Sequence, residues 1–190
     1  MNRAVFFDRD NTLIVDVPYS GDPAAVRLMP FAREALHWLD DAGFDLVVIS
    51  NQSAVGRGLI RRDQVDAVNR EMERQLGRRF FKGMYFCFDD PDRPEDNCRK
   101  PSPMLILRAA GEHSIDLSRS FMVGDRESDL EAGRRAGCRT VLVHGAENSQ
   151  KSDPGSVLAD YRASHLLDAA RWIIESGSRS SRESRERGSG

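Results

Sequence analysis

The sequence lacks the features of exported and membrane-spanning proteins. No apolar run approaches the ~18 residues that a membrane helix needs. Residues 1–7 show no charged segment followed by a long apolar stretch and a cleavage site. The three cysteines, Cys87, Cys98 and Cys138, are too few and odd in number for the disulfide framework of a secreted domain. We therefore expect a cytoplasmic protein with free thiols and no membrane contact.

Excess charge and aromatic residues are also missing. The formal net charge is -2, and aromatic residues make up 7% of the chain. Nucleic-acid binding favours a basic surface, and single strands favour exposed aromatic rings on which bases stack. No aromatic residue stands beside Arg57 or Arg99. Nucleic acid is therefore not the expected partner, and any phosphate site must be built locally.

The remaining composition is that of a soluble globular protein, with 39% apolar and 31% charged residues over 190 positions. This length suits one domain with a single core. Residues 176–190 contain only Ser, Arg, Glu and Gly, so no large apolar burial offsets the entropy of ordering them. We expect one domain over residues 1–175 and a disordered tail over 176–190. A monomer is favoured, although the sequence does not determine the oligomeric state.

Short apolar runs alternate with helical patterns along the chain, which is typical of βαβ units around a mostly parallel sheet. The strands expected lie at residues 4–7, 46–49, 84–88, 121–123 and 140–143, with a short sixth near 164–166. Apolar spacing predicts helices that begin near residues 31, 65, 103, 128 and 167. The clearest start has Ser102 as N-cap and Pro103 as the first helical residue. The fold class expected is three-layer α/β.

Polar residues follow several of these strands directly. They are Asp8, Asp10 and Thr12 after the first strand, Ser50 and Asn51 after the second, and Asp125 and Asp129 after the fourth. The carboxyl ends of parallel strands form the ligand crevice of such sheets, so these side chains should converge. The pair Arg99 and Lys100, just before a helix N-terminus, suits phosphate.

Each cluster alone has an ordinary alternative. Aspartates also cap loops, Ser-Asn also forms turns, and basic pairs in loops are usually solvated. In combination, the clusters resemble the four motifs of the haloacid dehalogenase-like phosphohydrolases. The first motif matches Asp8-x-Asp10-x-Thr12, the second Ser50, the third Lys100, and the fourth Gly124-Asp125 with Asp129. The resemblance covers residues from about 3 to 145 and implies a Rossmann-like core. The spacing between motifs leaves no room for a large cap domain.

The resemblance also implies roles for these residues. Asp8 is the nucleophile that forms an aspartyl-phosphate, and Asp10 is the general acid and base. The Mg²⁺ ligands implied are Asp8, Asp10 through its carbonyl, Asp125 and Asp129, the last of which orients either Lys100 or a metal-bound water. Phosphate oxygens are assigned to Thr12, Ser50, Asn51 and Lys100. A non-catalytic phosphate-binding domain on the same fold stays an alternative.

The motifs look most like a subgroup whose members act on heptose 1,7-bisphosphate, histidinol phosphate or 3′-phosphorylated DNA ends. We expect a small phosphorylated sugar, with the heptose bisphosphate as the leading candidate. Arg57 and Arg99 would bind its second phosphate. Histidinol phosphate and nucleic-acid 3′-ends are the alternatives.

Two departures from the subgroup stand out. Asn11 occupies a position where the family usually has glycine, and asparagine tolerates left-handed backbone better than most residues. The subgroup often carries a zinc loop of form Cys-x-His and Cys-x-Cys, but this chain has Asp89 and Asp96 at two of those places. Structural zinc prefers Cys and His ligands. Structural zinc is therefore not expected, and Cys87 and Cys98 are predicted to be free.

Overall fold

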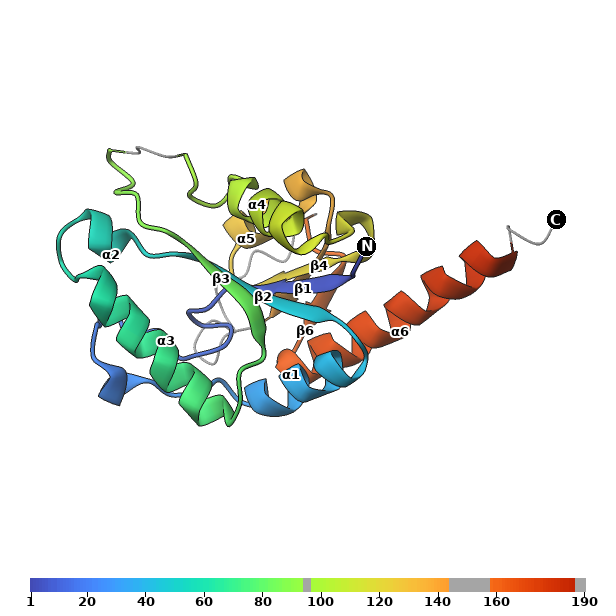
Figure 1. Cartoon of the computed structure of the whole chain (residues 1–190), viewed down its shortest axis with the longest axis horizontal. Coiled ribbons are helices and arrows are strands. Elements are labelled where there is room, and N and C mark those ends of the chain that lie inside the picture. The colour runs from blue at the N-terminus through green and yellow to red at the C-terminus, as the bar shows by residue number, and fades with distance from the viewer. Residues whose placement is uncertain (94–96, 144–157, 187–190) are drawn as a thin grey trace.

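The computed structural model describes residues 1–93, 97–143 and 158–186. Its six named strands form one sheet in the order β3-β2-β1-β4-β5-β6, and every neighbouring pair is parallel (Figure 1). The strands are β1 Ala4–Phe7, β2 Asp45–Asn51, β3 Phe81–Cys87, β4 Phe121–Gly124, β5 Arg139–Val143 and β6 Tyr161–Ala163. The all-parallel sheet confirms the α/β class.

Helices cover both faces of the sheet and complete the three layers. They are α1 Ala32–Asp41, α2 Ser53–Gly56, α3 Arg62–Leu76, α4 Met104–His113, α5 Glu127–Ala136 and α6 Leu166–Glu186, with short 3-10 helices η1 Pro23–Ala25 and η2 Leu117–Arg119. Side chains of β1 alternate between the faces. Val5 and Phe7 pack with α1, α3 and α6, whereas Ala4 and Phe6 pack with α4 and α5. Figure 1 shows these two groups of helices on opposite faces of the sheet. No helix of the described residues is long and apolar enough to span a membrane.

Strand order explains where the site lies. The chain passes from β1 to β2 and β3 on one side, and then to β4, β5 and β6 on the other. The carboxyl ends of β1 and β4 are therefore neighbours at the switch point, where ligands bind in open parallel sheets. No separate cap domain occurs within the described ranges. Residues that follow β1, β2 and β4 can therefore meet in an open crevice.

Several element boundaries differ from the expectation by a few residues; strand β3, for example, begins at Phe81 rather than at residue 84. The sixth strand ends at Ala163 rather than covering 164–166, because the Asp168 carboxylate accepts a hydrogen bond from the Ser164 amide and helix α6 begins at Leu166. Helix α4 begins at Met104 with Pro103 as its N-cap. The predicted cap, Ser102, still accepts a 3.4 Å hydrogen bond from the Met104 amide.

The end of the chain also differs from the expectation. Helix α6 continues to Glu186, past residue 175, and extends away from the sheet (Figure 1). Its packing reaches Gly177, where an added Cβ would lie 3.0 Å from a guanidinium nitrogen of Arg3 and 3.3 Å from the Phe44 ring. Residues 187–190 lie outside the described residues. Disorder of the tail in solution stays a prediction.

Candidate active site

A buried lysine forms the centre of the site. Lys100 Nζ lies 2.6 Å from Asp8 Oδ1 and 2.7 Å from Asp129 Oδ1, and it donates a 2.9 Å hydrogen bond to the Ile49 carbonyl. Burial alone would lower the pKa of Lys100, but the carboxylates of Asp8 and Asp129 outweigh it and raise the pKa. The ammonium therefore stays charged between the ends of β1, β2 and β4.

The loop that carries this lysine is attached to β2 through Asn51. The Lys100 amide donates a 3.0 Å hydrogen bond to Asn51 Oδ1, and Asn51 Nδ2 donates at 3.3 Å to the Lys100 carbonyl. This pair fixes the backbone from which Lys100 reaches Asp8. The amide of Asn51 thus already serves the loop, in addition to the phosphate role predicted from the sequence.

Asp8, Asp125 and Asp129 place carboxylate oxygens within 4.8 Å of one another. Neither buried oxygen of Asp125 has a hydrogen-bond partner among the described residues. The nearest guanidinium, from Arg126, is 3.8 Å away. Burial, followed by repulsion from Asp8 and Asp129, raises the pKa of Asp125 to about 7. Such a cluster is costly without a cation, and its hard oxygen donors fit Mg²⁺.

Asp129 differs from the other two carboxylates because protein groups already occupy both of its oxygens. Lys100 contacts Oδ1, and Oδ2 accepts a 3.1 Å hydrogen bond from the Arg126 amide. Its close approach needs Gly124, where an added Cβ would lie 2.4 Å from the Asp129 side chain. Asp8 and Asp125 are therefore better placed than Asp129 as direct metal ligands.

Asp10 has a separate set of partners. Its carboxylate accepts hydrogen bonds from Arg9 and a 2.7 Å bond from Gln52 Nε2. Burial raises the pKa of Asp10, and Arg9 opposes this effect. The turn that separates Asp10 from the next residues has Asn11 at φ 58°, so asparagine adopts the left-handed conformation expected of it.

Comparison with known proteins identifies the family. A family model described as HAD-hydrolase-like matches residues 97–169. Over 186 residues the chain is 34% identical to D-glycero-D-manno-heptose-1,7-bisphosphate 7-phosphatase of Thermosynechococcus vestitus, with 90% of this chain and 94% of that protein covered. The chain belongs to the haloacid dehalogenase-like phosphatases.

Further members of this phosphatase family support the assignment. A D-glycero-beta-D-manno-heptose-1,7-bisphosphate 7-phosphatase of Helicobacter pylori is 35% identical over 147 residues, which cover 75% of this chain and 83% of that protein. The solved structure of D,D-heptose 1,7-bisphosphate phosphatase from B. bronchiseptica, complexed with magnesium and phosphate, has a TM-score of 0.80 and 25% identity. The alignment covers 92% of this chain and 99% of that one.

A cavity of about 500 Å³ opens at these strand ends. The predicted residues that line it are Asp8, Asp10, Asn51, Arg57, Arg99, Lys100 and Asp129. Thr12, Ser50 and Asp125 do not line it. Thr12 Oγ1 is buried without a hydrogen-bond partner among the described residues, and Ser50 Oγ accepts a 3.0 Å bond from Gln52. Phosphate contacts by Thr12 and Ser50 stay predictions.

The two predicted arginines differ in their surroundings. Arg57 lies 3.5 Å from carboxylate oxygens of Asp90 and Asp92. The pKa of Arg99 is lowered by burial, then by the positive charges of Arg126 and Arg57, while Asp89 opposes the shift. Arg99 is therefore a partly buried guanidinium that lies in the positive field of two neighbouring arginines.

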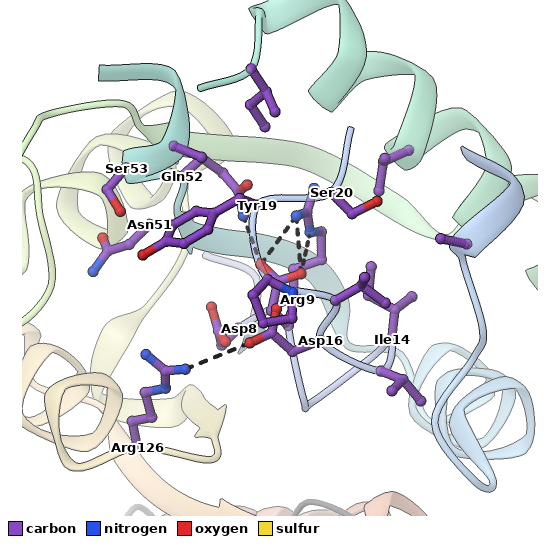
Figure 2. A pocket seen from close by; sticks show the side chains of 18 of the residues that line it. Asp8, Arg9, Ile14, Asp16, Tyr19, Ser20, Asn51, Gln52, Ser53 and Arg126 are labelled. Atoms are coloured by element: carbon purple, nitrogen blue, oxygen red, sulfur yellow. Dashed lines mark hydrogen bonds and ion pairs between the residues drawn. The ribbon is translucent and has the colours of Figure 1, made fainter. Parts of the chain in front are cut away.

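Several residues that line the cavity had no role predicted from the sequence. They are Arg9, Asp16, Tyr19, Gln52 and Arg126. Arg126 contacts Asp16 at 3.9 Å across the cavity mouth (Figure 2). Arg9 and Arg126 stand directly beside motif aspartates in the sequence, and this position could have indicated that they lie at the site. Asp16 and Tyr19 lie in the part of the β1–α1 connection that follows the first motif, where the sequence offers no further motif.

The prediction of free thiols at Cys87 and Cys98 is wrong. The two residues form a disulfide with a Cα–Cα distance of 5.4 Å, and Cys138 is the free cysteine of the described residues. Cys87 ends β3, and Cys98 stands two residues before Lys100, so the fold brings together sulfurs that sequence spacing alone cannot pair. Cys87, Asp89 and Cys98 also form a group that could hold a metal. Asp96 lies outside the described residues.

Proposed function

We propose that this chain is a Mg²⁺-dependent phosphomonoesterase that forms an aspartyl-phosphate on Asp8 and acts on D-glycero-D-manno-heptose 1,7-bisphosphate. The observation that carries the proposal is the carboxylate cluster, in which Asp8 contacts buried Lys100 and lies beside the unpartnered oxygens of Asp125. A nucleophilic carboxylate must be ionised and must meet a phosphate despite their like charges. Lys100 supplies positive charge within 2.6 Å of Asp8.

The residues at the site divide the reaction between them. Asp8 attacks phosphorus in line, so that an oxygen–phosphorus bond forms as the bond to the sugar oxygen breaks. Asp10 gives a proton to the departing alkoxide and later takes one from the water that hydrolyses the aspartyl-phosphate. Lys100 stabilises charge on the transferring group. The carboxylates of Asp8 and Asp125, together with the Asp10 carbonyl, would hold Mg²⁺, which would supply further positive charge and lower the repulsion between the two anions.

Two observations support the choice of substrate. Relatives at 34% and 35% identity are named as phosphatases of heptose 1,7-bisphosphate. Arg57 and Arg99 line the cavity in addition to Lys100, and a guanidinium fork suits a phosphate that is not being transferred. A bisphosphate substrate supplies a second anion for this part of the cavity.

A substrate panel tests the proposal. Phosphate release is measured with heptose 1,7-bisphosphate, sugar monophosphates, histidinol phosphate and a 3′-phosphorylated oligonucleotide, each with Mg²⁺ and with EDTA. We expect the highest kcat/KM for the heptose bisphosphate and loss of turnover in EDTA. Equal rates on sugar monophosphates and on the heptose bisphosphate would contradict the substrate assignment. Full activity in EDTA would contradict the proposed dependence on Mg²⁺.

A further inference from the structure

Helix α3 turns one polar side chain toward the core. Its buried residues are Val65, Val68, Asn69, Met72 and Leu76, of which Asn69 is polar. Asn69 is only 7% exposed, and burial of an amide costs free energy unless the group is hydrogen-bonded. Asn69 Oδ1 accepts a 3.0 Å hydrogen bond from Arg9 Nη1. A valine or leucine would fit the helical pattern equally well, so the amide needs another explanation.

The partner of Asn69 is itself buried and directed at the site. Arg9 is 5% exposed. Its Nε and Nη2 donate to Asp10 Oδ1 at 3.1 and 3.0 Å, and Nη2 also donates to Asp10 Oδ2 at 3.1 Å. With Nη1 bound to Asn69, every guanidinium nitrogen has a partner. Because Asn69 holds the third nitrogen, the plane of the Arg9 guanidinium is fixed. The guanidinium in turn fixes the orientation of the Asp10 carboxylate that it binds.

The same carboxylate is held from a second direction. Gln52 Nε2 donates to Asp10 Oδ2 at 2.7 Å and to Ser50 Oγ at 3.0 Å. Asp10 is thus held by its neighbour Arg9 and by Gln52, which directly follows β2. A general acid works only within about 2.6–3.2 Å of the oxygen that it protonates. Small rotations of the Asp10 side chain would break that contact.

We propose that Arg9 and Asn69 are positioning residues for the leaving-group chemistry of Asp10. Asn69 holds Arg9, Arg9 orients the Asp10 carboxylate, and helix α3 thereby contributes to catalysis without contact to the reacting atoms. The inference rests on the proposed role of Asp10 as general acid. It assigns a catalytic reason to a buried amide that helical periodicity does not explain.

Substrates with different leaving groups test this inference. A sugar phosphate leaves as a basic alkoxide that needs a proton, whereas p-nitrophenolate leaves readily without one. We compare kcat/KM, because this parameter reports only on the steps up to formation of the aspartyl-phosphate. It does not depend on the later hydrolysis of that intermediate. Asn69→Leu removes the acceptor at similar volume. We expect a loss of about tenfold on the sugar phosphate and of less than about twofold on p-nitrophenyl phosphate.

Three further variants serve as controls for the Asn69→Leu result. Asn69→Asp keeps an oxygen acceptor for Arg9 and should restore most of the loss. Met72→Ala loosens the same face of α3 without removing a polar contact, so it should lower the Tm and leave the ratio of the two kcat/KM values unchanged. Asp10→Asn should show the same selectivity as Asn69→Leu, to a larger extent. A misfolded fraction lowers both activities equally and therefore leaves the ratio unchanged.

The outcomes separate this inference from the proposed function. If Asp10→Asn shows the leaving-group selectivity and Asn69→Leu loses activity equally on both substrates, or on neither, the positioning role is wrong while Asp10 remains the acid. If Asp10→Asn itself has no selectivity, the acid role fails, and the positioning role fails with it.

Discussion

Lys100 and Asp125 show two opposite ways in which this protein buries a charged residue. The ammonium of Lys100 is balanced by Asp8 and Asp129. Removal of one partner from such a buried network commonly costs ~3–5 kcal/mol. The carboxylate of Asp125 has no such balance, and both its oxygens lack hydrogen bonds within the described residues. The unpartnered Asp125 therefore indicates that a ligand binds beside it. The partnered Lys100 is already in place beside Asp8, the proposed nucleophile.

The raised pKa of Asp125 predicts how metal binding depends on pH. Between its ordinary value of 3.8 and about 7, the unfolded chain carries an ionised Asp125 while the folded protein keeps the proton. The metal-free protein therefore loses stability as pH rises through this window, and the loss is complete above it. Mg²⁺ needs the ionised carboxylate. We expect Mg²⁺ to raise the Tm more at pH 8 than at pH 6.

The control for this measurement is Asp125→Asn. This variant should raise the metal-free Tm at pH 8 and remove most of the Mg²⁺-dependent shift, because the buried charge and its metal ligand are lost together. An equal Mg²⁺ shift at both pH values in the unmodified protein would contradict the assignment of Asp125 to the metal site.

Substitution of the two cavity arginines should separate their roles. Arg99→Ala should lower kcat/KM for the sugar bisphosphate by about 10–100-fold, equivalent to roughly 1.4–2.7 kcal/mol, and hardly affect p-nitrophenyl phosphate. Arg57→Ala is the matched comparison. Its loss should be smaller, because Arg57 already contacts Asp90 and Asp92. An equal loss on both substrates would instead place Arg99 at the transferring phosphate.

Among the secondary-structure elements, the strand ends are where most of the candidate site could be predicted from the sequence. Asp8, Asn51 and Asp129 were expected to converge because they follow parallel strands, and hydrogen bonds and ion pairs to Lys100 join all three. Helix α3 was predicted from its apolar spacing, but the same spacing hides Asn69. A polar residue on a buried helix face acquires meaning only from the residue opposite it, and that contact spans 60 positions.

The connection between β3 and the Lys100 loop was not predicted for the same reason. Which sulfurs pair depends on how β3 ends, and the Cys87–Cys98 disulfide ties that end to the loop. Closing a loop of this length stabilises a fold by about 3 kcal/mol in the chain-entropy view. We expect a reductant to lower the Tm by several degrees.

Thiol titration and metal analysis check the state of these cysteines. The denatured, unreduced protein should show a single thiol from Cys138 and, after reduction, all three. Because disulfide sulfurs cannot act as thiolate ligands, purified protein should contain much less than one zinc per chain. Three thiols before reduction would contradict the disulfide. Stoichiometric zinc that is lost on Cys87→Ser and Cys98→Ser would show a metal site instead.

At the scale of the whole molecule, the chain is one α/β layer structure with an extended C-terminal helix. Helix α6 passes close to Arg3 and Phe44 at Gly177, where an added Cβ would lie 3.0 Å from the first side chain and 3.3 Å from the second. The remaining residues contain only Ser, Arg, Glu and Gly. The apolar pattern could predict where the core ends to within a few residues. It could not show that Arg3 and Phe44 continue the packing to Gly177.

Truncation tests the proposed tail. A chain of residues 1–178 should keep the Tm and the kcat/KM of the full protein, because the segment removed offers no apolar burial. A chain of residues 1–173 should lose several degrees of Tm, since it lacks the turn that reaches Arg3. Loss of stability in the longer truncation would show that residues 179–190 contribute to the fold.

Asp8 is the residue on which the proposed chemistry of a metal-dependent sugar phosphatase depends most, because it is the group proposed to be phosphorylated. The direct measurement is mass spectrometry of protein quenched in acid during turnover of heptose 1,7-bisphosphate with Mg²⁺. The peptide that contains Asp8 should carry one phosphoryl group, hydroxylamine should remove it, and neither EDTA-treated protein nor Asp8→Asn should acquire it. Phosphate release at full rate by Asp8→Asn, or a phosphoryl group on another residue, would contradict the account.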